Sequence, residues 1–357
     1  MTGVKLTVPF TSGQSRAIVR RFGRTPRVPA VPLLPPDCTE GQWRAARLAR
    51  VGASELAAVL ECSPYASPFS LWWSKQEGWP TPETLGMKVG TMLEPIIAEL
   101  FAQSRPDLMV ARSGAGLWGH PDYDFLSCTP DFLAVTNICP DCMGTINEDE
   151  NCPLCNGVGY MRTPRVEPVE CKSDEGGAGW GRPGTDEVPA HHAVQVFTQC
   201  EIFDADRGHL VRLAGKRFAA YVLDYTPDRR ATMRDAWIPA ARSFVTSLET
   251  GIQPDIDGHK ATAEALRERH PAIEPDKRVS LGLELVRRLD RYSEAVKHAN
   301  AELALVKNQI RDALGDAEFG TTPGGTPVIH RTIGKRAGYS VAPTIVDSVR
   351  RMKGDLP

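Results

Sequence analysis

The chain lacks the features that would place it in a membrane or outside the cell. Its 357 residues contain no run of about 18 consecutive apolar residues, which excludes a transmembrane helix. The N-terminus has no apolar segment followed by a small-residue cleavage site, so we expect no secretory signal. We therefore expect a cytoplasmic protein with no membrane partner.

The chain also lacks a net charge that would attract polyanions, because 42 Lys and Arg face 44 Asp and Glu and the formal net charge is −2. Any surface for nucleic acid must come from local clusters. Residues 1–40 form one such cluster, with six basic residues before the first acid, Asp37, and five prolines between positions 26 and 36 that oppose regular helix. This segment is either a solvated tail or a basic arm that contacts DNA phosphates.

Cysteine is too sparse, in a chain of this length, for the disulfide framework of a small secreted domain. Four of the nine cysteines instead form two CPxCxG pairs: Cys139, Cys142, Cys152 and Cys155. Four thiolates at this spacing predict a tetrahedral structural Zn²⁺ site on an insert at residues 137–160. A closed site of four sulfurs leaves no position for catalysis, so we expect a rigid clip.

The insert interrupts a pattern of acidic and basic residues. Asp131 lies in an apolar run before the insert, and Glu170-Cys171-Lys172 lies in a second apolar run after it. On a strand Glu170 and Lys172 share a face and Cys171 points to the other. Two carboxylates suit Mg²⁺ or Mn²⁺, and a neighbouring ammonium can orient a water or stabilise charge on a phosphate. The pattern predicts a divalent-metal phosphodiesterase.

Helices on both sides of this pattern contribute further candidates. An amphipathic helix follows from the apolar spacing of Leu93–Phe101, and Glu94 lies beside its apolar stripe as a possible metal ligand. Gln195 and Gln199 are four residues apart on the helix expected after Pro189. Ser54 is expected to cap the start of a helix, where backbone N–H groups near Arg47 could bind an anion.

The remaining sequence divides into four parts. We predict a basic, proline-rich arm at 1–40, a core at 41–255, a linker at 256–275, and a long helix with a small hairpin at 276–357. The long helix carries apolar residues at alternating steps of four and three: Leu285, Leu289, Tyr292, Val296, Ala299, Leu303, Val306, Ile310 and Ala313. This heptad stripe predicts packing against a partner helix, either residues 233–248 of the same chain or another subunit.

Five ordered motifs within residues 43–225 resemble the lambda-exonuclease, YqaJ-like viral recombinase family. They are WxxxRxxxxxxS from Trp43 to Ser54, GTMLEP, SCTPDF, VECK and VPxxxxxQVxxQ. The resemblance implies the PD-(D/E)xK, restriction-endonuclease-like fold, an α/β core with a mixed central sheet flanked by helices. It also implies Mg²⁺-dependent degradation of double-stranded DNA from a 5′ end, in phage-type recombination with a single-strand annealing protein. A phage-encoded protein would act in the host cytoplasm.

The same resemblance assigns roles to individual residues. Glu94, Asp131, Glu170 and the backbone carbonyl of Cys171 resemble the metal ligands, Lys172 the catalytic lysine, and Gln195 a supporting glutamine. Arg47 and Ser54 match groups that bind the 5′-phosphate. The family's trimer is a further implication, although the zinc insert and the last 80 or so residues lie outside the family pattern.

Two alternatives stay open at the level of sequence. One is a RecB-like or CRISPR-associated nuclease of the same fold, in which the four cysteines would hold an iron–sulfur cluster. The other is a catalytically inactive, zinc-bearing DNA-binding protein.

Overall fold

The computed structural model describes residues 29–78, 84–113, 115–136, 165–174, 176 and 178–334. The chain forms two compact units, Met1–Arg269 and His270–Pro357. The predicted zinc ligands, Cys139, Cys142, Cys152 and Cys155, lie outside the described residues.

A five-stranded sheet forms the centre of the first unit, in the order β3-β6-β7-β8-β9. Its strands are Met109–Arg112, Phe132–Val135, Val166–Lys172, Arg207–Ala214 and Arg217–Asp224. Only β7 and β8 are paired in parallel, and the other neighbours are antiparallel. The expectation of a mixed sheet in an α/β core is confirmed.

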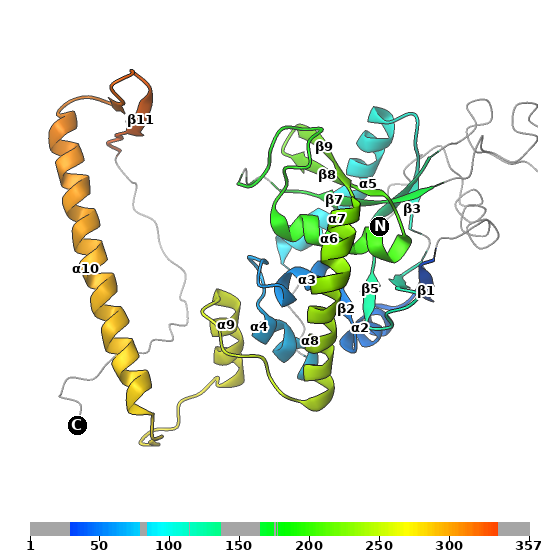
Figure 1. Cartoon of the computed structure of the whole chain (residues 1–357), viewed down its shortest axis with the longest axis horizontal. Helices are drawn as coiled ribbons and strands as arrows, with labels where there is room; N and C mark the ends of the chain where they lie inside the picture. Colours follow the sequence, from blue (N-terminus) through cyan, green and yellow to red (C-terminus); the bar gives the residue numbers. More distant parts are fainter. Residues whose placement is uncertain are drawn as a thin grey trace, which may run out of the picture. The chain divides into compact units, whose positions relative to one another are not determined.

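One long helix covers each face of this sheet (Figure 1). On one face α5 (Leu85–Ser104) packs Ile97 and Phe101 against Val169 and Cys171 of β7. On the other face α6 (Ala190–Phe203) belongs to a larger cluster that includes Leu210 of β8. Because side chains alternate along β7, Glu170 faces α6 while its neighbour Cys171 faces α5.

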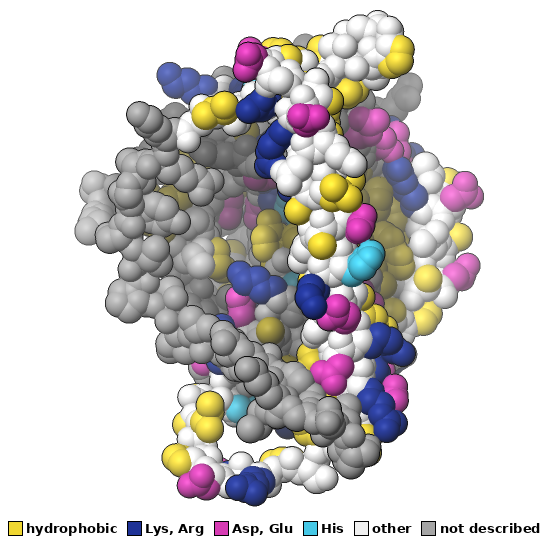
Figure 2. Space-filling model, turned by 90° about the vertical axis from the view of Figure 1, so that its left-hand side faces the viewer, with side chains coloured by type: hydrophobic (Ala, Val, Ile, Leu, Met, Phe, Trp, Pro, Cys, Tyr) yellow, Lys and Arg dark blue, Asp and Glu magenta, His cyan; other side chains and the backbone are white. Residues whose placement is uncertain are grey.

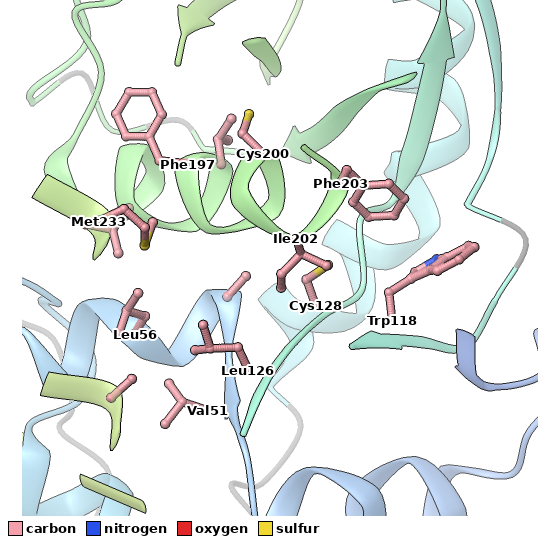
Figure 3. Close-up of a cluster of buried hydrophobic side chains, with 14 of the residues drawn as sticks. Val51, Leu56, Trp118, Leu126, Cys128, Phe197, Cys200, Ile202, Phe203 and Met233 are labelled. Carbon is pink, nitrogen blue, oxygen red and sulfur yellow. The ribbon is translucent and has the colours of Figure 1, made fainter. Parts of the chain in front are cut away.

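The larger core cluster lies between α6 and a layer formed by the N-terminal part of the chain. This layer contains α2 (Glu40–Leu48), α3 (Ala53–Val59) and α4 (Pro68–Gln76), with the four-stranded sheet β1-β4-β5-β2. The strands of that sheet are Val31–Leu34, Leu117–Gly119, Leu126–Cys128 and Val51–Gly52. Figure 3 shows Ile202 of α6 pointing toward Cys128 and Leu126, and Phe203 beside Trp118, with the two ring centroids 5.2 Å apart.

Two predicted boundaries differ from the structure. Val31–Leu34, within the predicted arm, forms β1 and pairs with β4. The strand tolerates Pro32 because β1 is at the edge of its sheet, where a missing N–H breaks no ladder on the open side. The predicted linker contains α9 (Lys260–Arg269), whose Thr262 is buried and bonded to Ser67 at 2.6 Å. Burial of Thr262 against α4 explains why this polar segment is ordered.

The segment after the β8–β9 hairpin is helical throughout. It consists of α7 (Pro227–Thr232), a π-helical segment η1 (Met233–Trp237) and α8 (Ile238–Thr250). Met233, Phe244 and Val245 are buried in the larger core cluster. The apolar face of this segment is therefore used within the first unit.

The second unit contains α10 (Leu283–Leu314) followed by a hairpin of β10 (Phe319–Thr321) and β11 (Pro327–His330), which confirms the predicted helix and hairpin. None of the residues of α10 is buried. Of the heptad stripe, Leu285, Tyr292 and Val296 each expose more than half of their surface. Apolar side chains alternate with charged ones along this helix in Figure 2.

Among the described residues, no helix is both long enough and apolar enough to span a membrane.

Candidate active site

Asp131 is positioned by the end of a strand pairing. The pairing of β6 with β7 ends at Phe132, which lies opposite Val169. The N–H of Cys171, next along this edge of β7, therefore has no partner on β6. The Oδ2 atom of Asp131 accepts a hydrogen bond from this N–H at 2.8 Å. The side chain thus takes over the backbone's role in the ladder, and the carboxylate is held beside Glu170.

Glu170 is buried and receives hydrogen bonds at both oxygens. Its Oε1 accepts from Lys172 Nζ and from Gln195 Nε2, each at 2.6 Å. Its Oε2 accepts from Gln199 Nε2 at 2.7 Å. Gln195 and Gln199 reach the same carboxylate because residues four apart share one face of a helix. The carboxylate is therefore fixed in one orientation by donors from β7 and α6.

The three predicted carboxylates act on one another electrostatically. Burial raises the pKa of Asp131 well above its usual range, and the charges of Glu170 and Glu94 add to this shift. Burial and the charge of Glu170 also raise the pKa of Glu94. Glu94, from α5, is thus part of the same electrostatic group as Asp131 and Glu170. Acids with strongly shifted pKa values that lie close together are typical of functional sites, so this group is a candidate site.

Lys172 supplies a positive charge at the centre of this group. Burial by itself would lower the pKa of the Lys172 ammonium, but the charges of Glu170 and Asp131 outweigh it and the pKa is raised. The side chain therefore stays protonated at neutral pH. Within the described residues no three His, Cys, Asp or Glu side chains are grouped as a ready set of metal ligands. The chemistry of the donors nonetheless suits a hard divalent cation, whose charge would offset the mutual repulsion of the carboxylates.

His192, at the start of α6, interacts electrostatically with Lys172. Burial, together with this charge, lowers the pKa of His192 to about 2, so its ring is neutral. The ring packs between Trp180 and His191, with centroid distances of 5.5 and 4.0 Å. These contacts indicate a packing role.

Arg47 and Ser54, predicted to bind a phosphate, lie side by side. Arg47 Nη2 is 3.4 Å from Ser54 Oγ and 2.6 Å from Glu55 Oε1. The prediction that Ser54 caps the helix is wrong, because α3 begins at Ala53 and Gly52 is its N-cap. The reason is that Glu55 Oε2 accepts the N–H of Gly52 at 2.8 Å, which satisfies that donor without a cap side chain.

Two contacts go beyond the roles assigned from the sequence. Gln199, named as a candidate with Gln195 but given no role, donates to Glu170 as Gln195 does. Lys75 of α4 bonds Glu55 Oε2 and the carbonyl of Arg47, each at 2.9 Å. No local pattern marks Lys75, because its partners are 20 or more residues away in the sequence.

Residues 42–206 match the model of the YqaJ-like viral recombinase domain, which confirms the resemblance seen in the sequence. The chain is 23% identical over 293 residues to the uncharacterized protein YqaJ of Bacillus subtilis (strain 168), covering 80% of this chain and 81% of that protein.

Some solved structures are also similar to part of this chain. The alkaline exonuclease LHK-Exo from Laribacter hongkongensis aligns with 65% of this chain and 98% of its own, at 18% identity and a TM-score of 0.40. The structure of LHK-Exo in complex with dAMP aligns over the same shares, at 18% identity and a TM-score of 0.41.

Proposed function

We propose that the protein is a metal-dependent exonuclease that degrades double-stranded DNA in phage-type recombination. The observation that carries the proposal is the group formed by Asp131, Glu170 and Lys172, which two glutamines of α6 hold in place. The match of residues 42–206 to the YqaJ-like viral recombinase domain supports a nuclease that acts in recombination.

The carboxylates of Asp131 and Glu170 would hold Mg²⁺ or Mn²⁺, with Glu94 and the backbone carbonyl of Cys171 as further ligands. Such a cation supplies Lewis-acid polarisation of a phosphoryl oxygen and lowers the pKa of a bound water. The raised pKa of Asp131 and of Glu94 supports this assignment, because both shifts arise from burial and crowded negative charge.

The protein's own residues have distinct tasks in this proposal. The protonated Lys172 donates hydrogen bonds, so it orients the attacking water or stabilises negative charge on the phosphate. Gln195 and Gln199 keep Glu170 from rotating away, since each holds a different oxygen. Arg47, with Ser54 beside it, would bind a terminal 5′-phosphate and set the 5′ to 3′ direction.

The remaining parts of the proposal concern partners. We propose a single-strand annealing protein as the recipient of the product strand, a structural zinc site at Cys139, Cys142, Cys152 and Cys155, and cytoplasmic location. The exposed heptad stripe of α10 supports a homo-oligomer, and the family resemblance suggests a trimer. Light scattering on the full chain measures that mass, and a monomer at micromolar concentration would contradict the oligomer.

The test of the function is digestion of linear duplex DNA with Mg²⁺. We expect loss of a 5′-phosphorylated linear duplex, slower loss of the 5′-hydroxyl form, and an intact closed circle. Lys172→Ala should abolish cleavage with little loss of DNA binding, while Lys216→Ala, at an exposed position in the β8–β9 turn, should cleave normally. Cleavage of the circle would indicate an endonuclease, and normal cleavage by the Lys172 variant would refute the assigned site.

A further inference from the structure

Three helices meet at a partly buried group of charges around Arg47. Glu55 of α3 forms two ion pairs: its Oε1 atom lies 2.6 Å from Arg47 Nη2, and its Oε2 atom lies 2.9 Å from Lys75 Nζ. Lys75 also donates to the backbone carbonyl of Arg47 at 2.9 Å. The Arg47 guanidinium is stacked 4.1 Å from the ring centroid of Trp43. The side chain of Arg47 is thus held by contacts from α2 and α3, while Lys75 of α4 bonds the backbone of Arg47.

The position of Lys75 is unusual for a lysine. Only 5% of its side chain is exposed, whereas lysine is almost never fully buried unless it is paired. Burial lowers the pKa of Lys75, and Glu55 counteracts that shift. Truncation of one member of a buried ion pair leaves the other charge uncompensated. Burial of the Lys75 ammonium therefore costs desolvation free energy, and its two hydrogen-bond partners indicate the role of this residue.

The charge balance of the group explains the need for Lys75. Arg47 alone would be neutralised by Glu55, because the two form a short ion pair. An incoming phosphate would then meet a neutral pair whose carboxylate repels it. With Lys75 the group of Arg47, Glu55 and Lys75 carries a net charge of +1. The hydrogen bonds that Arg47 makes with the described part of the chain use Nη2, so Nη1 and Nε can donate to an anion.

We infer that Lys75 is a positioning residue that neutralises Glu55 and so keeps the Arg47 guanidinium available to a terminal phosphate. Glu55 orients the guanidinium by binding one edge of it, and Lys75 prevents Glu55 from cancelling its charge. This inference rests on the proposed function, because the phosphate is that of the 5′ end of the substrate.

The experiment measures equilibrium binding of a short blunt duplex by the full chain in EDTA, with and without a 5′-phosphate. Fluorescence anisotropy gives the affinity ratio of the two duplexes, which we call the phosphate preference. A fraction of misfolded protein affects both duplexes equally and cancels in this ratio. We expect Lys75→Met to lower the phosphate preference about tenfold, the effect of losing one charge-assisted hydrogen bond.

The matched variants are Glu55→Gln and the double variant Lys75→Met with Glu55→Gln. By charge balance, Glu55→Gln raises the group to +2 and keeps the preference, and the double variant returns it to +1 and restores the preference. A purely structural role for Lys75 predicts the opposite, since the double variant loses two packing contacts. An unrestored preference in the double variant would therefore overturn the inference.

Cleavage assays on the same duplexes separate this inference from the proposed function. A wild-type protein that prefers the phosphate in binding but cleaves nothing would refute the nuclease and leave the role of Lys75 supported. A wild-type protein with no phosphate preference would overturn the role of Lys75, whether or not DNA is cleaved. Normal cleavage together with an unchanged preference in Lys75→Met would overturn the inference alone.

Discussion

Replacement of Gln199 by methionine removes one hydrogen bond from Glu170 and nearly preserves the volume of the side chain. Gln199 is fully buried on α6, and its Nε2 is the only described donor to Glu170 Oε2. In the variant this oxygen loses its partner inside the protein. Gln195 and Lys172 still bind Oε1, so the carboxylate stays in place but can rotate about its last bond.

The expected effect on stability is small. A hydrogen bond to a charged acceptor contributes roughly 1.5–3 kcal/mol. Methionine also removes the Oε1 atom of Gln199, which is buried without a hydrogen-bond partner in the described part of the chain, and its loss returns roughly 1 kcal/mol. We therefore expect the free energy of unfolding to fall by about 1 kcal/mol.

The expected effect on activity is larger. Loss of a group that orients a metal ligand typically lowers metal affinity or activity by about 10- to 100-fold. The assay is cleavage of linear duplex DNA as a function of Mg²⁺ concentration, and we expect half-maximal cleavage at about 10-fold higher Mg²⁺ or more. Urea unfolding without metal measures the change in stability separately.

Thr198→Val is the matched control for this variant. Thr198 is adjacent to Gln199 and equally buried, but its hydroxyl donates to the carbonyl of Val194 within the helix, at 2.7 Å. We expect this control to lose some stability while its Mg²⁺ dependence stays that of the wild type. A Gln199→Met protein with the same Mg²⁺ dependence as the control would refute the argument that Gln199 orients a metal ligand.

Two further predictions concern other parts of the chain. Burial alone would raise the pKa of Glu55, but Arg47, Lys75 and the Gly52 N–H outweigh it and the pKa lies below the usual 4.5. The stabilisation by ionised Glu55 is therefore present above pH 4.5 and is lost as the pH falls through the lower pKa of the folded state. The free energy of unfolding should then decline less steeply below pH 4.5 in Glu55→Gln than in the wild type. Parallel curves of unfolding free energy against pH for the two proteins would contradict this prediction. The second prediction is that the four insert cysteines hold one zinc ion per chain, as measured by elemental analysis, and that Cys139→Ser loses this ion. A brown, iron-containing protein would instead indicate an iron–sulfur cluster.

Much of the site could be predicted because its pattern is local. Glu170 and Lys172 share a face since side chains alternate along any strand, and their 2.6 Å contact follows from that geometry. The amphipathic spacing of α5 placed Glu94 beside a buried stripe, and the long helix α10 followed from its heptads in the same way. These features depend on the periodicity of one element at a time.

Other features depend on contacts between distant segments, so the sequence could not supply them. Val31–Leu34 is a strand only because β4 provides a partner, and α9 is ordered in the predicted linker because Thr262 reaches Ser67. The cap of α3 is Gly52 since the side chain of Glu55 is fixed by Arg47.

The sequence by itself was enough to predict which residues would carry the proposed chemistry, because Asp131, Glu170 and Lys172 follow from residue type and strand periodicity. Only the tertiary structure decided how these residues are held. Gln199 reaches Glu170 because α6 packs across β7, and Lys75 reaches Glu55 because α4 packs beside α3. Such contacts arise from the packing of whole elements, which brings side chains 20 or more residues apart in the sequence to the same carboxylate.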